Sequence, residues 1–354
     1  MSPTPSDSWP MFRGDARHSG RVSQQLERPA LSGAPREVWS VDSGGVIESS
    51  PTVVDGRVFV GSFANKLLAL NADDGAPLWE FAVGGLLRCS PSVAEGRVFF
   101  GADDSRFYAV DAATGAELWR FELGEGGHQS SPALWGELVV FGAFDHKIYA
   151  LDAASGALVW AHETGGAILS SPLVARDTVF IGSEDGLLYA LDAANGTPRW
   201  THATNGPVWS SPALAGELVV FGSDDGSVHA LHADTGAPAW THATEADVFS
   251  SPAVNAAGTA LYVGSRDGKL RKLDARSGEL IWATDLGGPV FASPALGEHV
   301  IVGCGDGLAA LRRDTGELVW KHPFSERVWS SATLVGTRAY VGSHDGFVRV
   351  LESR

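Results

Sequence analysis

The sequence predicts an all-β fold, a single eight-bladed β-propeller of four-stranded blades, closed by pairing of an N-terminal strand with the last blade. Two repeats of the same period predict it, and units of about 40 residues match one blade. Tryptophan recurs at Trp39, Trp79, Trp119, Trp160, Trp200, Trp240, Trp282 and Trp320. A Ser-Pro pair, which becomes Ser-Ala in the last copy, recurs at Ser50, Ser90, Ser131, Ser171, Ser211, Ser251, Ser293 and Ser331.

Residues 207–240 show one repeat clearly. Four strands are expected in it, over 208–214, 217–222, 227–231 and from 237 onward. The second segment is rich in apolar and β-branched residues, which favour strands. Asp225-Gly226 and Asp234-Thr235-Gly236 separate the later strands, because glycine accepts the positive φ of a tight turn. Each repeat is therefore expected to supply four strands, from the innermost to the outermost of a blade.

The two ends of the chain predict how the ring closes. Residues 37–39 look like an outer strand with no inner strands before it. The last repeat, 329–351, has three inner strands but stops before its tryptophan. Together they complete one blade, which leaves no long exposed edge strand. The chain is thus divided into an N-terminal lead-in, 1–35, and the propeller, 36–354.

Composition excludes several classes of partner. The formal net charge of −16 argues against nucleic acid and against an anionic membrane surface, both of which attract clustered Lys and Arg. No apolar run is long enough to insert into a membrane, and the first nine residues lack the apolar core of a signal peptide. A monomer is expected. It would be cytoplasmic as the sequence stands, and periplasmic or secreted if a leader has been removed.

The repeat resembles that of a known family. Residues 182–200 read Gly-Ser-x-Asp-Gly-x-Leu-Tyr-Ala-Leu-Asp-Ala-x-x-Gly-x-x-x-Trp, which is similar to the tryptophan-docking repeat of the pyrroloquinoline-quinone-type (quinoprotein) propellers. Residues 9–15, Trp-Pro-Met-Phe-Arg-Gly-Asp, resemble the lead-in of bacterial members. The resemblance covers nearly the whole chain. It implies that the tryptophans dock one blade on the next.

The resemblance implies a quinone only for the enzymes of that family, which hold it against a disulfide of adjacent cysteines, with a calcium ion nearby. Here Cys89 and Cys304 are far apart, and no set of calcium ligands can be assigned. No cofactor is therefore expected, pyrroloquinoline quinone included, and no metal site. The chain resembles more closely the non-catalytic members, among them the lipoprotein of outer-membrane β-barrel assembly, although it shows no lipid-attachment cysteine.

Comparison of the eight copies with one another predicts a functional face. The residue two places before each repeating serine marks the start of an innermost strand, at one rim of the central channel. Around the ring it reads Glu48, Arg88, Gln129, Leu169, Trp209, Phe249, Phe291 and Trp329. Polar groups therefore gather in the first three blades and large aromatic groups in the last four. His128 replaces an aliphatic residue one place earlier.

The turn between the second and third strands is expected at the same rim. Its variable position reads Phe63, Asp103, Phe144, Glu184, Asp224, Arg266, Gly305 and His344. The last five blades have Asp-Gly in this turn, whereas the first three read Ala64-Asn65, Asp104-Ser105 and Asp145-His146. The irregular turns and the polar channel residues thus fall in the same three blades.

A funnel with a polar side and an aromatic side resembles a ligand site. We expect it to bind a small molecule or a protein partner through Gln129, Trp209, Phe249, Phe291, Trp329, Phe63, Phe144, Asp103, His146 and His344. The alternative is a cofactor-independent cyclase, isomerase or lyase, with Glu48 or His128 as general acid or base and Arg88 as an anion contact. A quinone-dependent dehydrogenase is a weak third hypothesis. In the purely structural interpretation, Glu48 and Arg88 form an ion pair between blades and the aromatic residues plug the channel.

Overall fold

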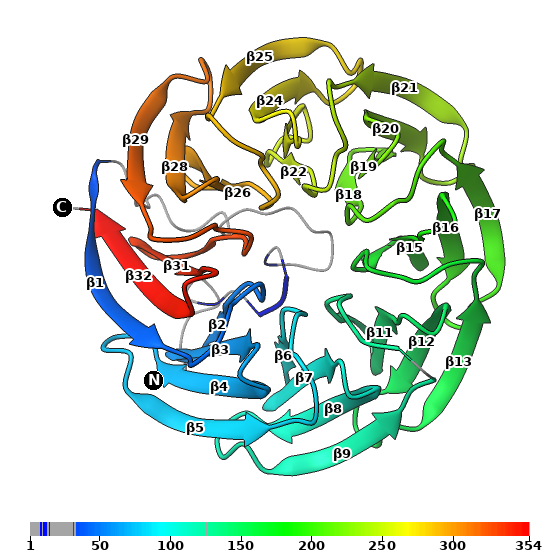
Figure 1. The fold of residues 1–354 in the computed structure, drawn as a ribbon. Helices are drawn as coiled ribbons and strands as arrows, with labels where there is room; N and C mark the ends of the chain where they lie inside the picture. The colour runs from blue at the N-terminus through cyan, green and yellow to red at the C-terminus, as the bar shows by residue number, and fades with distance from the viewer. Residues whose placement is uncertain are drawn as a thin grey trace.

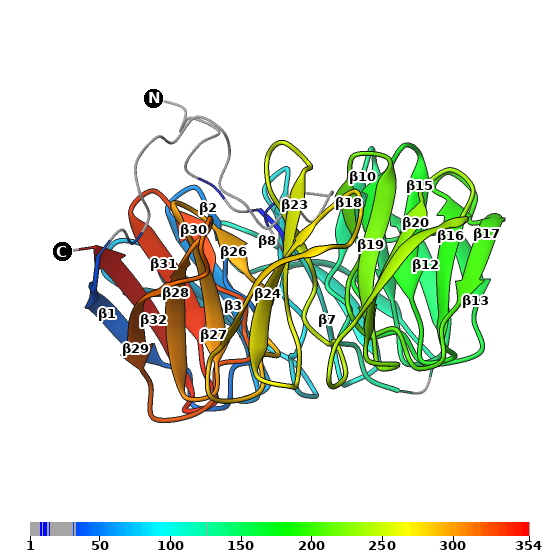
Figure 2. The same cartoon turned by 90° about the horizontal axis from the view of Figure 1, so that it is seen from above.

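The protein is a closed ring of eight four-stranded antiparallel sheets (Figure 1). The computed structural model describes residues 8, 10–12, 14, 31, 33–124 and 126–353. Seen from the side, the blades stand next to one another around the ring (Figure 2). The fold expected from the repeats is confirmed. Trp9, Arg13 and Asp15 of the lead-in lie outside the described residues.

Each blade contributes one strand to each of four concentric layers. The innermost strands are β2 (Thr52–Val54), β6 (Ser92–Ala94), β10 (Ala133–Trp135), β14 (Leu173–Ala175), β18 (Ala213–Ala215), β22 (Ala253–Val254), β26 (Ala295–Leu296) and β30 (Thr333–Val335). The second strands are β3 (Arg57–Ser62), β7 (Arg97–Ala102), β11 (Leu138–Gly142), β15 (Thr178–Gly182), β19 (Leu218–Ser223), β23 (Ala260–Gly264), β27 (His299–Cys304) and β31 (Arg338–Gly342).

The third and outermost layers follow in the same order. The third strands are β4 (Lys66–Asn71), β8 (Arg106–Asp111), β12 (Lys147–Asp152), β16 (Leu187–Asp192), β20 (Ser227–His232), β24 (Lys269–Asp274), β28 (Gly307–Arg312) and β32 (Phe347–Ser353). The outermost are β5 (Pro77–Ala82), β9 (Glu117–Glu122), β13 (Leu158–Glu163), β17 (Pro198–Ala203), β21 (Pro238–Ala243), β25 (Leu280–Asp285), β29 (Leu318–Pro323) and, for the last blade, β1 (Pro35–Asp42). We number the blades I (β2–β5) to VIII (β30–β32 with β1).

The innermost strands are shorter than the sequence predicts. Blade V was expected to begin its strand at residue 208, but β18 covers only Ala213–Ala215. The reason is that the residues before it bond to the neighbouring blades: the N–H of Ser211 donates to the Ser251 hydroxyl, and the carbonyl of Ser210 accepts from Ser170. Pro212 has no N–H to offer its own sheet. The other three strands of this blade agree with the prediction to within one or two residues.

The tryptophans connect each blade to the next. The indole N–H of Trp79, in blade I, donates to the carbonyl of Ala112 in blade II, and its ring lies against Gly115. A Cβ on Gly115 would stand 2.7 Å from that ring, so glycine is required at this turn. Seven of the eight tryptophans pack on the turn between the last two strands of the following blade in this way, as the family resemblance implies.

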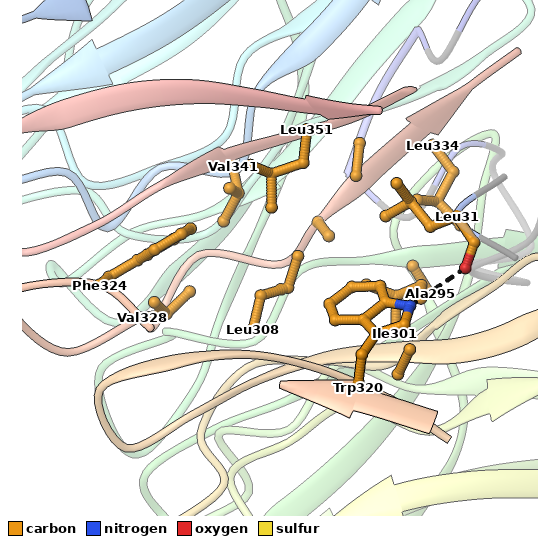
Figure 3. Packing of buried hydrophobic residues seen from close by; sticks show 13 residues of the cluster. Leu31, Ala295, Ile301, Leu308, Trp320, Phe324, Val328, Leu334, Val341 and Leu351 are labelled. Carbon is orange, nitrogen blue, oxygen red and sulfur yellow. Dashed lines mark hydrogen bonds between the residues drawn. The ribbon is translucent and has the colours of Figure 1, made fainter. Parts of the chain in front are cut away.

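Blade VIII is assembled from both ends of the chain. The N-terminal strand β1 pairs antiparallel with β32 and forms the outer edge of the blade (Figure 1). This blade therefore has no continuous turn on which Trp320 of blade VII could dock. Leu31 takes that place: its carbonyl accepts the indole N–H of Trp320, and its side chain is fully buried among residues of blades VII and VIII (Figure 3).

Among the described residues, no helix is long and apolar enough to cross a membrane.

Candidate functional site

A closed ring of hydrogen bonds surrounds the channel. In every blade, the backbone N–H of the repeating serine donates to the hydroxyl oxygen of the corresponding serine in the next blade, at 2.9–3.1 Å. The last bond runs from Ser331 to Ser50 and closes the circle. The Ser-Pro repeat thus has a function in the fold that its spacing alone did not reveal. It also fixes the position of the residue two places earlier in each blade.

Those eight preceding residues all line one central cavity of about 470 Å³. The eight repeating serines also line it. Seven of the residues singled out from the sequence lie here: Glu48, Arg88, Gln129, Trp209, Phe249, Phe291 and Trp329. Because consecutive blades contribute them in order, the polar and aromatic groups occupy separate sides of the wall.

On the polar side, Arg88 holds two carboxylates. Its Nη1 donates to Glu48 Oε2 at 3.2 Å and its Nε to Asp103 Oδ2 at 3.0 Å. The guanidinium carbon also lies 4.7 Å from the centroid of the Phe63 ring. Burial raises the pKa of Glu48 even though Arg88 acts in the opposite direction. The predicted ion pair between blades is therefore present, and it extends to a third residue.

On the aromatic side, four rings form a continuous arc. Trp209 and Phe249 have centroids 4.5 Å apart, Phe249 and Phe291 5.6 Å, and Phe291 and Trp329 4.7 Å. His344 extends the arc, since its ring lies 4.6 Å from that of Trp329. Its Nε2 is 3.6 Å from Glu48 Oε1, so the arc reaches the polar side. Burial lowers the pKa of His344, which favours the neutral imidazole.

His128 does not reach the cavity. Its imidazole is fully buried between Phe107 and Phe141, with ring centroids 5.6 and 5.3 Å away, and it packs against Gly101. Burial lowers its pKa to about 3. Neither ring nitrogen has a hydrogen-bond partner among the described residues. The side chain thus occupies the position that Leu87 fills in blade II, and the structure does not bring it together with Glu48 and Arg88.

Five further predicted residues lie outside the cavity wall. Asp103 and Phe63 contact Arg88, and His344 contacts Trp329. Phe144 is half-buried in its turn, where its N–H donates to the carbonyl of Gly127. His146 is exposed. It adopts a φ of 67°, as Asn65 (57°) and Ser105 (62°) do, which matches the positive φ of Gly186 at the same place in blade IV. The irregular turns of blades I–III therefore keep the backbone conformation of the Asp-Gly turns.

The turn of blade VII is the one that differs. Asp306-Gly307 was read as an Asp-Gly turn like those of blades IV–VI and VIII. In the structure, Gly307 begins β28 and pairs with Cys304, so the positive φ falls on Gly305 instead. The segment between the paired residues Gly303 and Leu308 is one residue shorter than the segment between the corresponding pair of blade IV, Gly182 and Leu188.

Apart from Leu169 and the repeating serines, two residues of the wall, Phe12 and Arg266, were not among the predicted site residues. Phe12 comes from the lead-in, where the neighbouring Pro10 accepts a hydrogen bond from the N–H of Val93. Arg266 belongs to the turn of blade VI and lies over Phe249 and Phe291. The signal in the sequence that could have identified it is its place at the variable position of this turn.

The residues present do not fit the quinone site of the related enzymes. Cys89 is fully buried, and burial raises its pKa to about 12. Its Sγ hydrogen-bonds to the backbone of Gly101, in the place that the Ser49 hydroxyl takes against Gly61 in blade I. Arg88 therefore does not activate it. Cys304 lies in another blade, so the two thiols cannot form the adjacent pair. Within the described part of the chain, no three His, Cys, Asp or Glu side chains are grouped to hold a metal ion.

Comparisons with known proteins agree with this architecture. A family model described as the β-propeller of the β-alanine-activating enzyme matches residues 136–354, and one described as outer membrane protein assembly factor BamB matches residues 30–171. A search of curated proteins finds no match.

Solved structures share the fold at low identity. BamB from Moraxella catarrhalis is 20% identical with a TM-score of 0.77, covering 90% of this chain and 100% of its own. The quinohemoprotein alcohol dehydrogenase of Comamonas testosteroni is 15% identical with a TM-score of 0.84, covering 99% and 81%. The computationally designed protein Ika8 is 18% identical with a TM-score of 0.78, covering 92% and 99%.

Proposed function

Because this chain belongs to the family of the β-alanine-activating enzyme's β-propeller, within the pyrroloquinoline-quinone-like propellers, we propose that it is a binding protein whose central cavity takes a small molecule. One observation carries the proposal: the residues two places before the eight repeating serines converge on one cavity of about 470 Å³ with a polar and an aromatic side. This size lies in the range of small-molecule sites. The fold itself hosts both partner binding and catalysis, so the argument rests on the cavity.

The geometry favours binding over catalysis. A general acid or base must be within hydrogen-bond reach of its substrate, and His128 is enclosed in the core instead. Glu48 and Arg88 bond to each other, and Arg88 is further held by Asp103. We therefore assign Glu48 and Arg88 to ligand recognition and derive no step through a quinone.

The same geometry favours a small molecule over a protein at this site. The aromatic rings of the arc line the cavity and are each partly buried. A protein would need a broad exposed surface to bury enough area for specific binding. Partner binding at the funnel, which the match to an assembly factor suggests, remains the second candidate.

The proposal is tested by screening a library of metabolites with native mass spectrometry and thermal shift. The wild type is compared with Phe291→Ala, which opens the aromatic arc, and with Leu118→Ala, an exposed outer-strand residue, as the control. We expect compounds that stabilise the wild type and the Leu118 variant but not the Phe291 variant. If no compound stabilises the wild type, the small-molecule function fails. If all three proteins respond alike, the site lies elsewhere.

A further inference from the structure

The charges in the cavity wall are unlike those of the whole chain. The chain carries a formal net charge of −16, yet its cavity is lined by two arginines, Arg88 and Arg266, and by a single carboxylate, Glu48. Carboxylates outside the wall, Asp103 and Asp247, pair with these arginines, but they use only part of each guanidinium. The donors that remain are suited to a partner of opposite charge.

Arg266 is placed to present its donors to a ligand. Its guanidinium carbon lies 5.7 Å from the centroid of Phe249 and 5.9 Å from that of Phe291, so the group rests on the aromatic arc. Its Nη1 donates to Asp247 Oδ2 at 2.7 Å, and this is the one hydrogen bond that the guanidinium makes to the described residues. An arginine has five N–H donors in a rigid fork. Because the side chain is 47% exposed, the remaining donors are open to a ligand at the cavity mouth.

Arg88 and Glu48 also make the cavity wall favourable to a negatively charged group. Two of the five donors of Arg88 are used, by Glu48 and Asp103, and its side chain keeps 28% exposure. Arg88, Asp103 and His344 are the charged or titratable groups that face Glu48. Burial raises the pKa of Glu48, so the one carboxylate of the wall is also the group whose charge is disfavoured there.

Building on the proposed small-molecule site, we propose that the cavity selects an anionic ligand, a carboxylate carried on a flat apolar body. The carboxylate pairs with the free edge of the Arg266 guanidinium, and the body packs on the ring of Trp329. A cationic ligand of the same shape is disfavoured, because Arg266 already occupies the aromatic faces that would stabilise it. An arginine–carboxylate pair supplies both the energy and the orientation.

The test uses three probes with one benzene ring and different charge: benzoate, neutral benzamide and cationic benzamidine. Isothermal titration calorimetry with the full chain should show benzoate binding about tenfold more tightly than the other two, which corresponds to one charge-assisted contact. Arg266→Gln should remove this preference, and Glu48→Gln should increase it. Arg120→Gln, on the outer strand β9, makes the same charge change away from the cavity and should leave the preference unchanged.

The outcomes separate this inference from the function on which it rests. Equal binding of the three probes, or a preference for benzamidine, would overturn the anionic selectivity and leave a small-molecule site in place. A benzoate preference that survives Arg266→Gln would also overturn it. If none of the probes binds at millimolar concentration, the inference fails, and the metabolite screen then decides whether the small-molecule function fails as well.

Discussion

The indole N–H of Trp320 donates to the backbone carbonyl of Leu31 at 3.2 Å, across 289 residues of sequence. This contact lets the lead-in complete a blade whose third and fourth strands come from opposite ends of the chain. Its contribution to stability can be measured directly, because Leu31 is fully buried whereas Leu78, on the outer strand β5, is 45% exposed.

Leu31→Ala is expected to lower the free energy of unfolding by about 2–4 kcal/mol, since it removes a buried side chain from the interface of blades VII and VIII. Leu78→Ala should change it by less than about 0.5 kcal/mol. Equilibrium denaturation by urea measures both. A Leu31 variant as stable as the wild type would show that the lead-in does not contribute to closure.

His128→Leu is expected to stabilise the protein by about 1–3 kcal/mol at pH 7, because it removes two buried nitrogens without partners and Leu87 fills the same position in blade II. The folded-state pKa of His128 is about 3, below the unfolded value of about 6.5. Between these values only the unfolded chain takes up the proton, so the folded state loses stability as the pH falls below about 6.5.

The variant should therefore gain about a further 2 kcal/mol relative to the wild type when the pH falls from 7 to 5. Urea denaturation at the two pH values measures the difference. If the variant gained the same stability over the wild type at pH 7 and at pH 5, the imidazole of His128 would titrate normally and would not be enclosed in the core.

His146→Gly is expected to stabilise the protein by about 0.5–1 kcal/mol, because a left-handed φ of 67° is strained for any residue with a Cβ. The reverse change at the equivalent place in blade IV, Gly186→Ala, should destabilise it by about 1 kcal/mol or more, since the φ there is 81°. Thermal unfolding of the pair is the measurement. Changes of the same sign in both variants would contradict the shared turn conformation.

Ser211→Ala is expected to cost about 1–3 kcal/mol, because it leaves the buried N–H of Ser171 without its acceptor. Ser50→Ala removes the bond that closes the ring from Ser331 and should cost as much. The two sites are far apart, so the costs should add in the double variant. A much smaller cost at Ser50 in urea denaturation would show that the ring of bonds is open between blades VIII and I.

Much of the candidate site could be predicted because it repeats. The eight positions two places before the serines were identified by comparing the copies, and every one of them lines the cavity. The residue just before each of them faces a different way: successive residues of an extended chain point to opposite sides, so Gln129 meets the channel while His128 enters the core between blades II and III. Adjacency in the sequence therefore misled the interpretation of His128.

The sequence by itself determined the number of blades, the way in which the two ends join, and the side of the cavity on which polar and aromatic groups lie. These follow from a local pattern of about 40 residues that each blade satisfies in the same way. Only the tertiary structure decided that Arg88 holds both Glu48 and Asp103, that Arg266 lies on the aromatic arc and that Phe12 enters the wall. Such contacts join side chains from different turns and from the lead-in, and their distances depend on how the whole ring closes.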